Sequence, residues 1–201
     1  MIKNFIFAFL TALLFFSDLA AQSNCKLRKD QGGIKVYTCH TDTSHFKSIV
    51  AEFTINATLD ELTQFVLNIE NYTRWQYNTV TAKTVRKISA TELIYRTEIK
   101  APWPVTDRDM VVHLRITNDE KSLIIKTESE AGIIPLKKEF IRVPSSHAMW
   151  IVNQKSERQL QVKYTMQIDP GGSVPVWLVN WVCAQAPYQS FKNLKEQMGK
   201  E

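Results

Sequence analysis

Arg108 is the residue whose type and position point most directly to chemistry. It shares the alternation of the apolar positions 110, 112, 114 and 116, so a regular strand would turn its side chain toward the same apolar side. A guanidinium there must be paired and hydrogen-bonded, because an isolated charge is very costly in an apolar interior. Its partner is expected to be Glu98, Glu128 or Asp169, among which the strand pattern does not choose.

Two interpretations of Arg108 stay open. The first is an ion pair that only anchors the end of the strand. The second is the polar end of an otherwise apolar cavity. Such a cavity would suit a ligand with a long hydrocarbon body and one hydroxyl, carboxyl or phosphate group.

The other polar residues give no catalytic signature. The sequence contains no GxSxG, HExxH, CxxC, P-loop or GxGxxG motif. Asp107 and Asp109 flank Arg108 and could form a carboxylate pair, although ionic capping of a strand end is the commoner explanation. His113 is expected on a solvated face rather than as a general base. We therefore expect no catalytic residue, no metal site and no cofactor.

Alternation of apolar and polar residues predicts the elements that position Arg108. After a first hairpin, strands are predicted over residues 46–56, 79–88, 93–99, 110–117, 123–130, 137–143, 147–154 and 160–168. Such clean alternation is typical of an antiparallel sheet with one apolar and one polar face. Between the first two of these strands, the capping box Thr58-Leu59-Asp60-Glu61 opens a short amphipathic helix that runs to about Ile69.

The last segment changes to a helical period. Ser173 can cap this helix, and Pro175 falls in its first turn. The helix would span about 26 residues, or roughly 39 Å. Pro187 lies inside it and is expected to kink it. A long apolar helix that follows a large sheet is expected to lie across the apolar face of that sheet.

The space between this helix and the sheet is either a filled core or an apolar pocket. Large aromatic rings and flexible methionines can do either. If it is a pocket, we expect its ligand-binding residues to be Arg108 together with Tyr95, Met110, Val112, Trp150, Tyr164, Met166, Trp177, Trp181 and Tyr188. A ligand must also leave, so the helix around Pro187 and the loop at 132–135 are the expected gates.

The N-terminus has the pattern of an export signal. Lys3 precedes residues 5–16, which are apolar except for Thr11, and the small residues Ala20 and Ala21 follow. The apolar run is shorter than the roughly 20 residues of a spanning helix. The pattern predicts a signal peptide over residues 1–21 and one exported domain over 22–201, periplasmic or secreted. An uncleaved membrane anchor is the alternative.

The cysteines fit this interpretation. Cys25 and Cys39 flank the turn signal at residues 30–33, and a hairpin centred on Gly32 would place them opposite each other. We predict that they form a disulfide, which an exported protein can keep. A lipidated Cys25 is the alternative, although residues 22–24 match such a site poorly. Cys183 would then be a buried, unpaired thiol.

Composition excludes several classes of protein. Of the 201 residues, 44% are hydrophobic and 22% are charged, which is not the composition of a disordered or collagen-like chain. The net charge of +5 is not concentrated in a basic stripe, so we expect no nucleic-acid partner. The expected partners are a hydrophobic small molecule and, transiently, a membrane, with the chain acting as a monomer.

Four segments, in a consistent order over about residues 25–199, carry a family resemblance. They are Gly33-Ile34-Lys35-Val36-Tyr37, Tyr72-Thr73-Arg74-Trp75, Trp103-Pro104-Val105-Thr106-Asp107-Arg108-Asp109-Met110-Val111 and the stretch from Asp169-Pro170-Gly171-Gly172 to Asn180. Together they resemble the START (StAR-related lipid-transfer) domain family, and Arg108 matches that family's inward arginine by position.

The resemblance implies an α+β helix-grip fold, a curved antiparallel sheet wrapped around a long C-terminal helix with an internal apolar cavity. It also implies binding or transfer of a lipid, such as a sterol, phospholipid or fatty-acyl compound, without covalent chemistry. Two alternatives remain. One is a cyclase- or hydrolase-like enzyme of the same broad fold acting on an apolar substrate. The other is a structural module whose core is filled.

Overall fold

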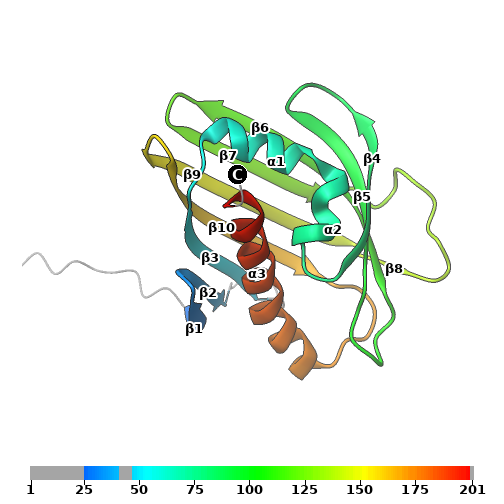
Figure 1. Ribbon diagram of the computed structural model, residues 1–201. Coiled ribbons are helices and arrows are strands. Elements are labelled where there is room, and N and C mark those ends of the chain that lie inside the picture. Colours follow the sequence, from blue (N-terminus) through cyan, green and yellow to red (C-terminus); the bar gives the residue numbers. More distant parts are fainter. Residues whose placement is uncertain (1–24, 41–46, 200–201) are drawn as a thin grey trace, which may run out of the picture.

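A computed structural model describes residues 25–40 and 47–199 (Figure 1). The predicted signal peptide lies outside the described residues. The strands are β1 (Cys25–Gln31), β2 (Ile34–Cys39), β3 (Ser48–Ile55), β4 (Thr79–Lys87), β5 (Glu92–Ile99), β6 (Arg108–Asp119), β7 (Ser122–Ser129), β8 (Ile141–Arg142), β9 (Ser145–Ser156) and β10 (Gln159–Asp169). The helices are α1 (Leu59–Leu67), the 3-10 turn η1 (Ile69–Asn71), α2 (Tyr72–Trp75) and α3 (Val176–Met198).

The strands form one sheet in the order β1-β2-β3-β10-β9-β7-β6-β5-β4, and β8 pairs in parallel with β6. All other pairs are antiparallel, as predicted. The sheet curves around α3, while α1 and α2 lie beside the C-terminal end of that helix (Figure 1). The inner face of the sheet and α3 therefore enclose the interior, as the helix-grip expectation requires.

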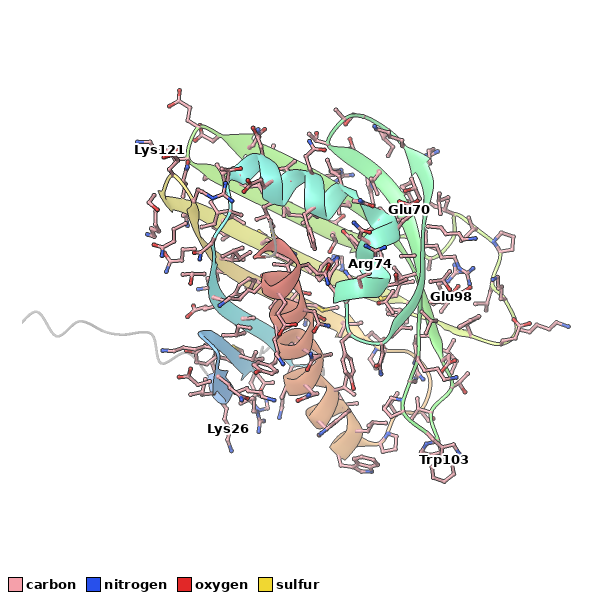
Figure 2. All side chains as sticks on the ribbon, in the orientation of Figure 1. Lys26, Glu70, Arg74, Glu98, Trp103 and Lys121 are labelled. Carbon is pink, nitrogen blue, oxygen red and sulfur yellow. A yellow bond between two sulfur atoms is a disulfide. The ribbon has the colours of Figure 1, made fainter. Side chains whose placement is uncertain are left out.

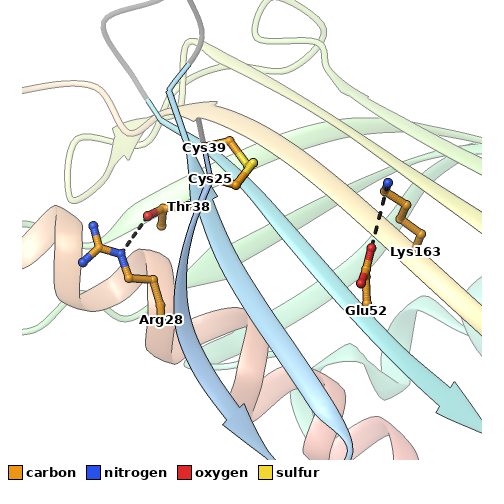
Figure 3. The surroundings of a disulfide bond; sticks show 6 residues. All are labelled: Cys25, Arg28, Thr38, Cys39, Glu52 and Lys163. Carbon is orange, nitrogen blue, oxygen red and sulfur yellow. Dashed lines mark hydrogen bonds and ion pairs between the residues drawn. A yellow bond between two sulfur atoms is a disulfide. The ribbon is translucent and has the colours of Figure 1, made fainter. Parts of the chain in front are cut away.

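The first hairpin confirms the predicted disulfide (Figure 3). Gly32 and Gly33 both have positive φ, which glycine adopts at little steric cost and which a tight two-residue hairpin turn requires. The turn places Cys25 directly opposite Cys39, and their sulfur atoms are bonded. Cys183 is a free cysteine.

The helix α1 confirms the predicted capping box. The backbone N–H of Glu61 donates to Thr58 Oγ1 at 3.2 Å, and the Thr58 N–H donates to Glu61 Oε2 at 2.7 Å. The sequence pattern did not predict the short turns after α1. They fold back because the Tyr72 hydroxyl donates to the carbonyl oxygen of Val66 at 2.7 Å. Trp75, at the end of α2, is buried in the core.

Two element predictions need correction. The strand predicted at 137–143 is only the two-residue β8, because residues 130–140 instead form a loop. The helix α3 begins at Val176, so its N-cap is Pro175 rather than the predicted Ser173, and Pro175 makes no side-chain hydrogen bond. Pro187 does lie inside α3.

Candidate ligand-binding cavity

The interior between the sheet and α3 is not filled. A cavity of about 320 Å³ lies there, at the lower end of the size range of small-molecule sites. Its lining is mainly apolar and includes seven of the residues predicted from sequence: Tyr95, Arg108, Met110, Val112, Trp150, Tyr164 and Met166. Strand alternation therefore identified the wall that the sheet contributes.

The helix contributes a different face from the one predicted. Trp177 and Trp181 are 65% and 48% exposed, and neither lines the cavity. Tyr188 is buried, but it also lies outside the lining, with the ammonium group of Lys29 4.0 Å from its ring centre. These three positions share one side of α3, because residues four or seven apart lie one or two turns along the same helix face. The prediction that they line the pocket is wrong for that reason.

The cavity side of α3 instead carries small residues. Cys183, Ala186 and Ser190 line the cavity together with Leu178 and Val182. Cys183, Ala186 and Ser190 are short, so this part of α3 leaves space beside the sheet, whereas Phe191 further along the helix contacts Trp150. Burial raises the pKa of the Cys183 thiol, so this side chain is less often a thiolate than an ordinary cysteine.

Aromatic rings close one part of the cavity wall. Trp150 makes edge-to-face contacts with Tyr164, Phe191 and Trp75, at centroid distances of 5.4, 5.2 and 6.3 Å. Burial raises the pKa values of Tyr95 and Tyr164, so both phenols remain neutral hydrogen-bonding groups. This wall presents flat apolar surface with only a few polar atoms.

Arg108 enters the cavity, but it has none of the carboxylate partners expected for it. Its side chain is 7% exposed, and its Nε donates to the carbonyl oxygen of Pro170 at 3.2 Å. Its Nη2 donates to the carbonyl oxygen of Gly171 at 2.9 Å, and its Nη1 donates to that of Thr106. Burial lowers the pKa of the guanidinium from its ordinary value, which Asp107 partly opposes.

The sheet register explains why the predicted partners are elsewhere. Glu98 lies opposite Asp109, and Glu128 lies opposite His113, so both glutamates belong to the outer face. Asp169 instead accepts a hydrogen bond from the Gly171 backbone at 2.8 Å. The expectation of a carboxylate partner for Arg108 is therefore wrong.

The Asp169-Pro170-Gly171-Gly172 turn holds Arg108 through its backbone. Gly171 and Gly172 have φ values of +65° and +62°, which side chains other than glycine rarely adopt. A Cβ atom on Gly172 would also lie only 2.9 Å from Ile141 Cδ1. The two glycines let the chain turn sharply while its carbonyl groups face the guanidinium.

The cavity reaches the surface beside the loop between β5 and β6. Lys100 and Asn78 are exposed lining residues, and Pro102 and Val105 of this loop also line the cavity. The neighbouring Trp103 is 90% exposed and points away from the molecule (Figure 2). Sequence reasoning missed this loop as a part of the site. The predicted gate at 132–135 contributes no lining residue, and its role as a gate stays a prediction.

The other candidate polar residues lie on the outer face of the sheet. Asp109 is fully buried between Arg96 and Arg142. His113 is only 8% exposed, so the expected solvated position is wrong, and it contacts Glu92 through Nε2 and Glu130 through Nδ1, each at 2.7 Å. Neither residue lines the cavity. Within residues 25–40 and 47–199, no group of three or more histidine, cysteine, aspartate or glutamate side chains could hold a metal ion.

Fold and site together define a class: a helix-grip domain with an apolar cavity between its sheet and its C-terminal helix. The model of the START domain family matches residues 26–200. The chain therefore belongs to the START domain family. In the part of the chain that the structure covers, no helix is long and apolar enough to cross a membrane.

Individual relatives support this assignment. The chain is 29% identical to uncharacterized protein PA1579 of Pseudomonas aeruginosa, over 88% of this chain and 87% of that protein. A crystal structure of a STAR-related lipid transfer protein from Xanthomonas axonopodis is 26% identical and has a TM-score of 0.80. The match covers 88% of this chain and 99% of that one.

A more distant likeness concerns the fold alone. The Zhui aromatase/cyclase from Streptomyces sp. R1128 is 8% identical and has a TM-score of 0.58, covering 78% of this chain and 95% of that one. The same broad fold therefore occurs in an enzyme.

Proposed function

We propose that the protein binds one hydrophobic ligand, a lipid, in the internal cavity and carries it without covalent chemistry. The observation that carries this proposal is the apolar cavity of about 320 Å³ between the sheet and α3. A protein interior is normally close-packed, so a hollow of this size is unusual unless something occupies it. Membership of the START family, which includes a bacterial STAR-related lipid transfer protein, supports the same proposal.

Burial of a hydrocarbon chain provides enough affinity for this role. Each buried methylene contributes roughly 0.8 kcal/mol, so a dozen methylenes require few hydrogen bonds in addition. The apolar wall formed by Met110, Val112 and Trp150 fits such a chain. Sterols, phospholipids and fatty-acyl compounds all belong to this class.

The composition of the lining favours binding over turnover. An enzyme acting on an apolar substrate, such as a cyclase or hydrolase, is the alternative. It would be expected to use Asp109 or His113 beside Arg108, but both point to the outer face. The described lining contains no aspartate, glutamate or histidine that could move a proton.

Exposed tryptophans support transient contact with a membrane. Trp103 belongs to the loop at the cavity opening, and Trp177 and Trp181 belong to the first turns of α3, whose other side lines the cavity. Tryptophan is favoured at membrane–water interfaces, where its ring is partly apolar and its N–H remains hydrated. We infer that the mouth of the cavity faces the membrane when the ligand is loaded or released.

We also propose that the protein is exported. The signal pattern of residues 1–21 motivates this, and the Cys25–Cys39 disulfide supports it, because such bonds persist mainly in oxidising compartments. Mass spectrometry of the protein from a periplasmic or medium fraction should find a chain that begins at Gln22. A chain that retains Met1 and sediments with membranes would contradict export by cleavage.

Native mass spectrometry tests the function. The full-length gene is expressed, and the purified protein is compared before and after extraction with organic solvent. The expected result is an added mass that extraction releases, with the intact lipid in the organic phase. A chemically altered compound that accumulates with time would indicate an enzyme. Protein that carries no lipid and takes up none from mixed vesicles would contradict the proposal.

A further inference from the structure

The charged residues that line the cavity all have the same sign. Lys47, Lys100 and Arg108 line it, and no carboxylate does among the residues that the structure describes. Lys100 is exposed near the opening, whereas Arg108 is buried. The potential inside the cavity is therefore positive, and it is strongest where water is excluded.

Protein contacts satisfy Arg108 only in part. A guanidinium has five N–H donors, and three of them have acceptors in the carbonyl groups of Thr106, Pro170 and Gly171. Two donors remain without an acceptor from the described residues. The carbonyl groups are neutral, so the positive charge itself is not compensated.

The nearest carboxylate is engaged with other groups. Asp107 accepts from the Lys100 ammonium group at 2.9 Å and from the Ala101 backbone at 3.0 Å. It makes no ion pair with Arg108 within the described part of the chain. Its charge is thus shared with Lys100.

Asp109 shows how the same strand neutralises another buried charge. That carboxylate is also buried, one residue away on the opposite face, and two arginines neutralise it. Burying an unpaired charge is costly, so this fold pairs the charge on its outer face. It leaves the charge at Arg108 to be paired by something else.

We propose that the ligand is an anionic amphiphile whose negatively charged group is received by Arg108. This proposal rests on the proposed function and narrows its ligand class. A carboxylate or a phosphate group matches the two parallel N–H donors of an arginine fork. The same charge would disfavour a lipid whose polar end is a hydroxyl group alone.

Strand geometry gives the orientation of such a ligand. Arg108 and Val112 are four residues apart on β6, or roughly 13 Å along the strand. Tyr95 lies opposite Val112, next to the aromatic wall. The anionic group would therefore lie at the Arg108 end, and the hydrocarbon chain would extend toward Tyr95 and Trp150.

Matched lipid pairs test this without altering the protein. Delipidated wild-type protein is titrated with oleic acid and oleyl alcohol, and with oleoyl lysophosphatidic acid and monoolein, at fixed pH and salt. Within each pair the hydrocarbon chain is the same. We expect the anionic member to bind on the order of tenfold or more tightly, as for a hydrogen bond to a charged group. A preference in the first pair only indicates a carboxylate ligand, and a preference in the second only indicates a phosphate.

A variant tests whether Arg108 causes the tighter binding of the anionic lipids. Arg108→Gln should lose the preference for the anionic member while it still binds the neutral one. Lys47→Gln is the matched control, since it removes another lining cation, breaks no ion pair among the described residues and should retain most of the preference. Circular dichroism and urea unfolding establish whether each variant is folded. If Arg108→Gln does not fold, the comparison of matched lipid pairs on wild-type protein still tests the proposal.

The two proposals fail in different ways. Equal binding of anionic and neutral members by wild-type protein would overturn the anionic ligand and leave lipid binding intact. Stronger binding of the neutral members would overturn it too. Binding of no member of either pair would overturn the anionic single-chain ligand, and the native mass spectrometry described above then decides separately whether lipid binding stands.

Discussion

Arg142 binds both carboxylate oxygens of Asp109: its Nε donates to Oδ1 and its Nη2 donates to Oδ2, each at 2.8 Å. Arg96 Nη2 also lies 2.9 Å from Oδ2. The Arg142 Nη1 atom donates to the carbonyl oxygen of Ala131 at 2.7 Å. One buried carboxylate therefore fixes the loop after β7 against the outer face of β6.

Removing this carboxylate's charge should destabilise the fold. Asp109→Asn would leave the largely buried Arg142 without its counter-ion and Arg96 with Glu98 alone, and breaking a buried pair in this way costs about 3–5 kcal/mol. Urea unfolding followed by circular dichroism measures the loss. Asp107→Asn is the matched control: its partner Lys100 is largely exposed, so the change should be below about 1 kcal/mol. Equal losses in the two variants would contradict this account.

The Asp109 carboxylate should make the free energy of unfolding depend on pH in the acid range. Burial alone would raise the pKa of Asp109, but hydrogen bonds from Arg142 and Arg96 outweigh it and hold the pKa below its ordinary value. This stabilisation is complete above the unfolded-state pKa of about 3.9 and is lost as pH falls through the lower folded-state value. Urea midpoints measured from pH 6 to pH 2 should fall more steeply below pH 4 for wild type than for Asp109→Asn. Parallel curves would rule out this role.

Loss of the disulfide should weaken the N-terminal hairpin and the whole domain. Cys25 and Cys39 are separated by 14 positions, and closing a loop of that length contributes about 3 kcal/mol. The double variant Cys25→Ser/Cys39→Ser should lose about that much free energy of unfolding. A reducing agent should lower the stability of wild type to the same level and leave the double variant unchanged. An effect of the reducing agent on both proteins would point to another cause.

Filling the cavity should abolish ligand uptake without unfolding the protein. Ala186 faces the cavity from α3, so Ala186→Phe places a ring in space that is empty. We expect uptake of a fluorescent fatty acid to fall at least tenfold, while the free energy of unfolding stays within about 1 kcal/mol of wild type. Ala90→Phe is the matched control, because Ala90 is exposed in the turn between β4 and β5. Undiminished uptake by Ala186→Phe would place the ligand elsewhere.

The exposed tryptophans should govern contact with membranes. Trp103→Ser and Trp177→Ser should each reduce co-sedimentation with phosphatidylglycerol-containing vesicles several-fold, because a tryptophan ring contributes favourably at the interface. Ile124→Ser is the control, since Ile124 is an exposed apolar residue on β7. A comparable decrease for Ile124→Ser would show that general surface apolarity, rather than the cavity mouth, binds vesicles.

The period of two in strands explains what the sequence could predict. Successive strand side chains point to opposite faces, so alternation alone assigned Tyr95, Met110 and Tyr164 to the cavity side of the sheet. The Cys25–Cys39 pair followed equally from a turn with known chemistry. The family resemblance completed the fold, because its four segments appear in the expected order.

The helical half of the site was less predictable. The first turns of α3 are apolar on both sides, so periodicity could not tell Trp177 and Trp181 from Leu178 and Val182. The small residues of α3, such as Ala186, also have no sequence pattern that marks them as cavity-lining, although their size leaves space for the cavity.

Backbone contacts were also invisible to the sequence pattern. Arg108 was expected to pair with a side chain, whereas the Asp169-Pro170-Gly171-Gly172 turn offers it carbonyl groups. The available signal was the pair of adjacent glycines, which marks a turn that side chains would obstruct. The sheet places Glu98 opposite Asp109 and Glu128 opposite His113, which excludes both glutamates as partners.

The sheet ends at β1 on one side and at β4 on the other among the described strands. Both end strands are rich in cations: Lys26, Arg28 and Lys29 on β1, and Lys83, Arg86 and Lys87 on β4. Like charges on bare strands keep two molecules from adding their edges to each other. The same charges should therefore keep this domain monomeric at concentrations where an uncharged sheet edge would associate.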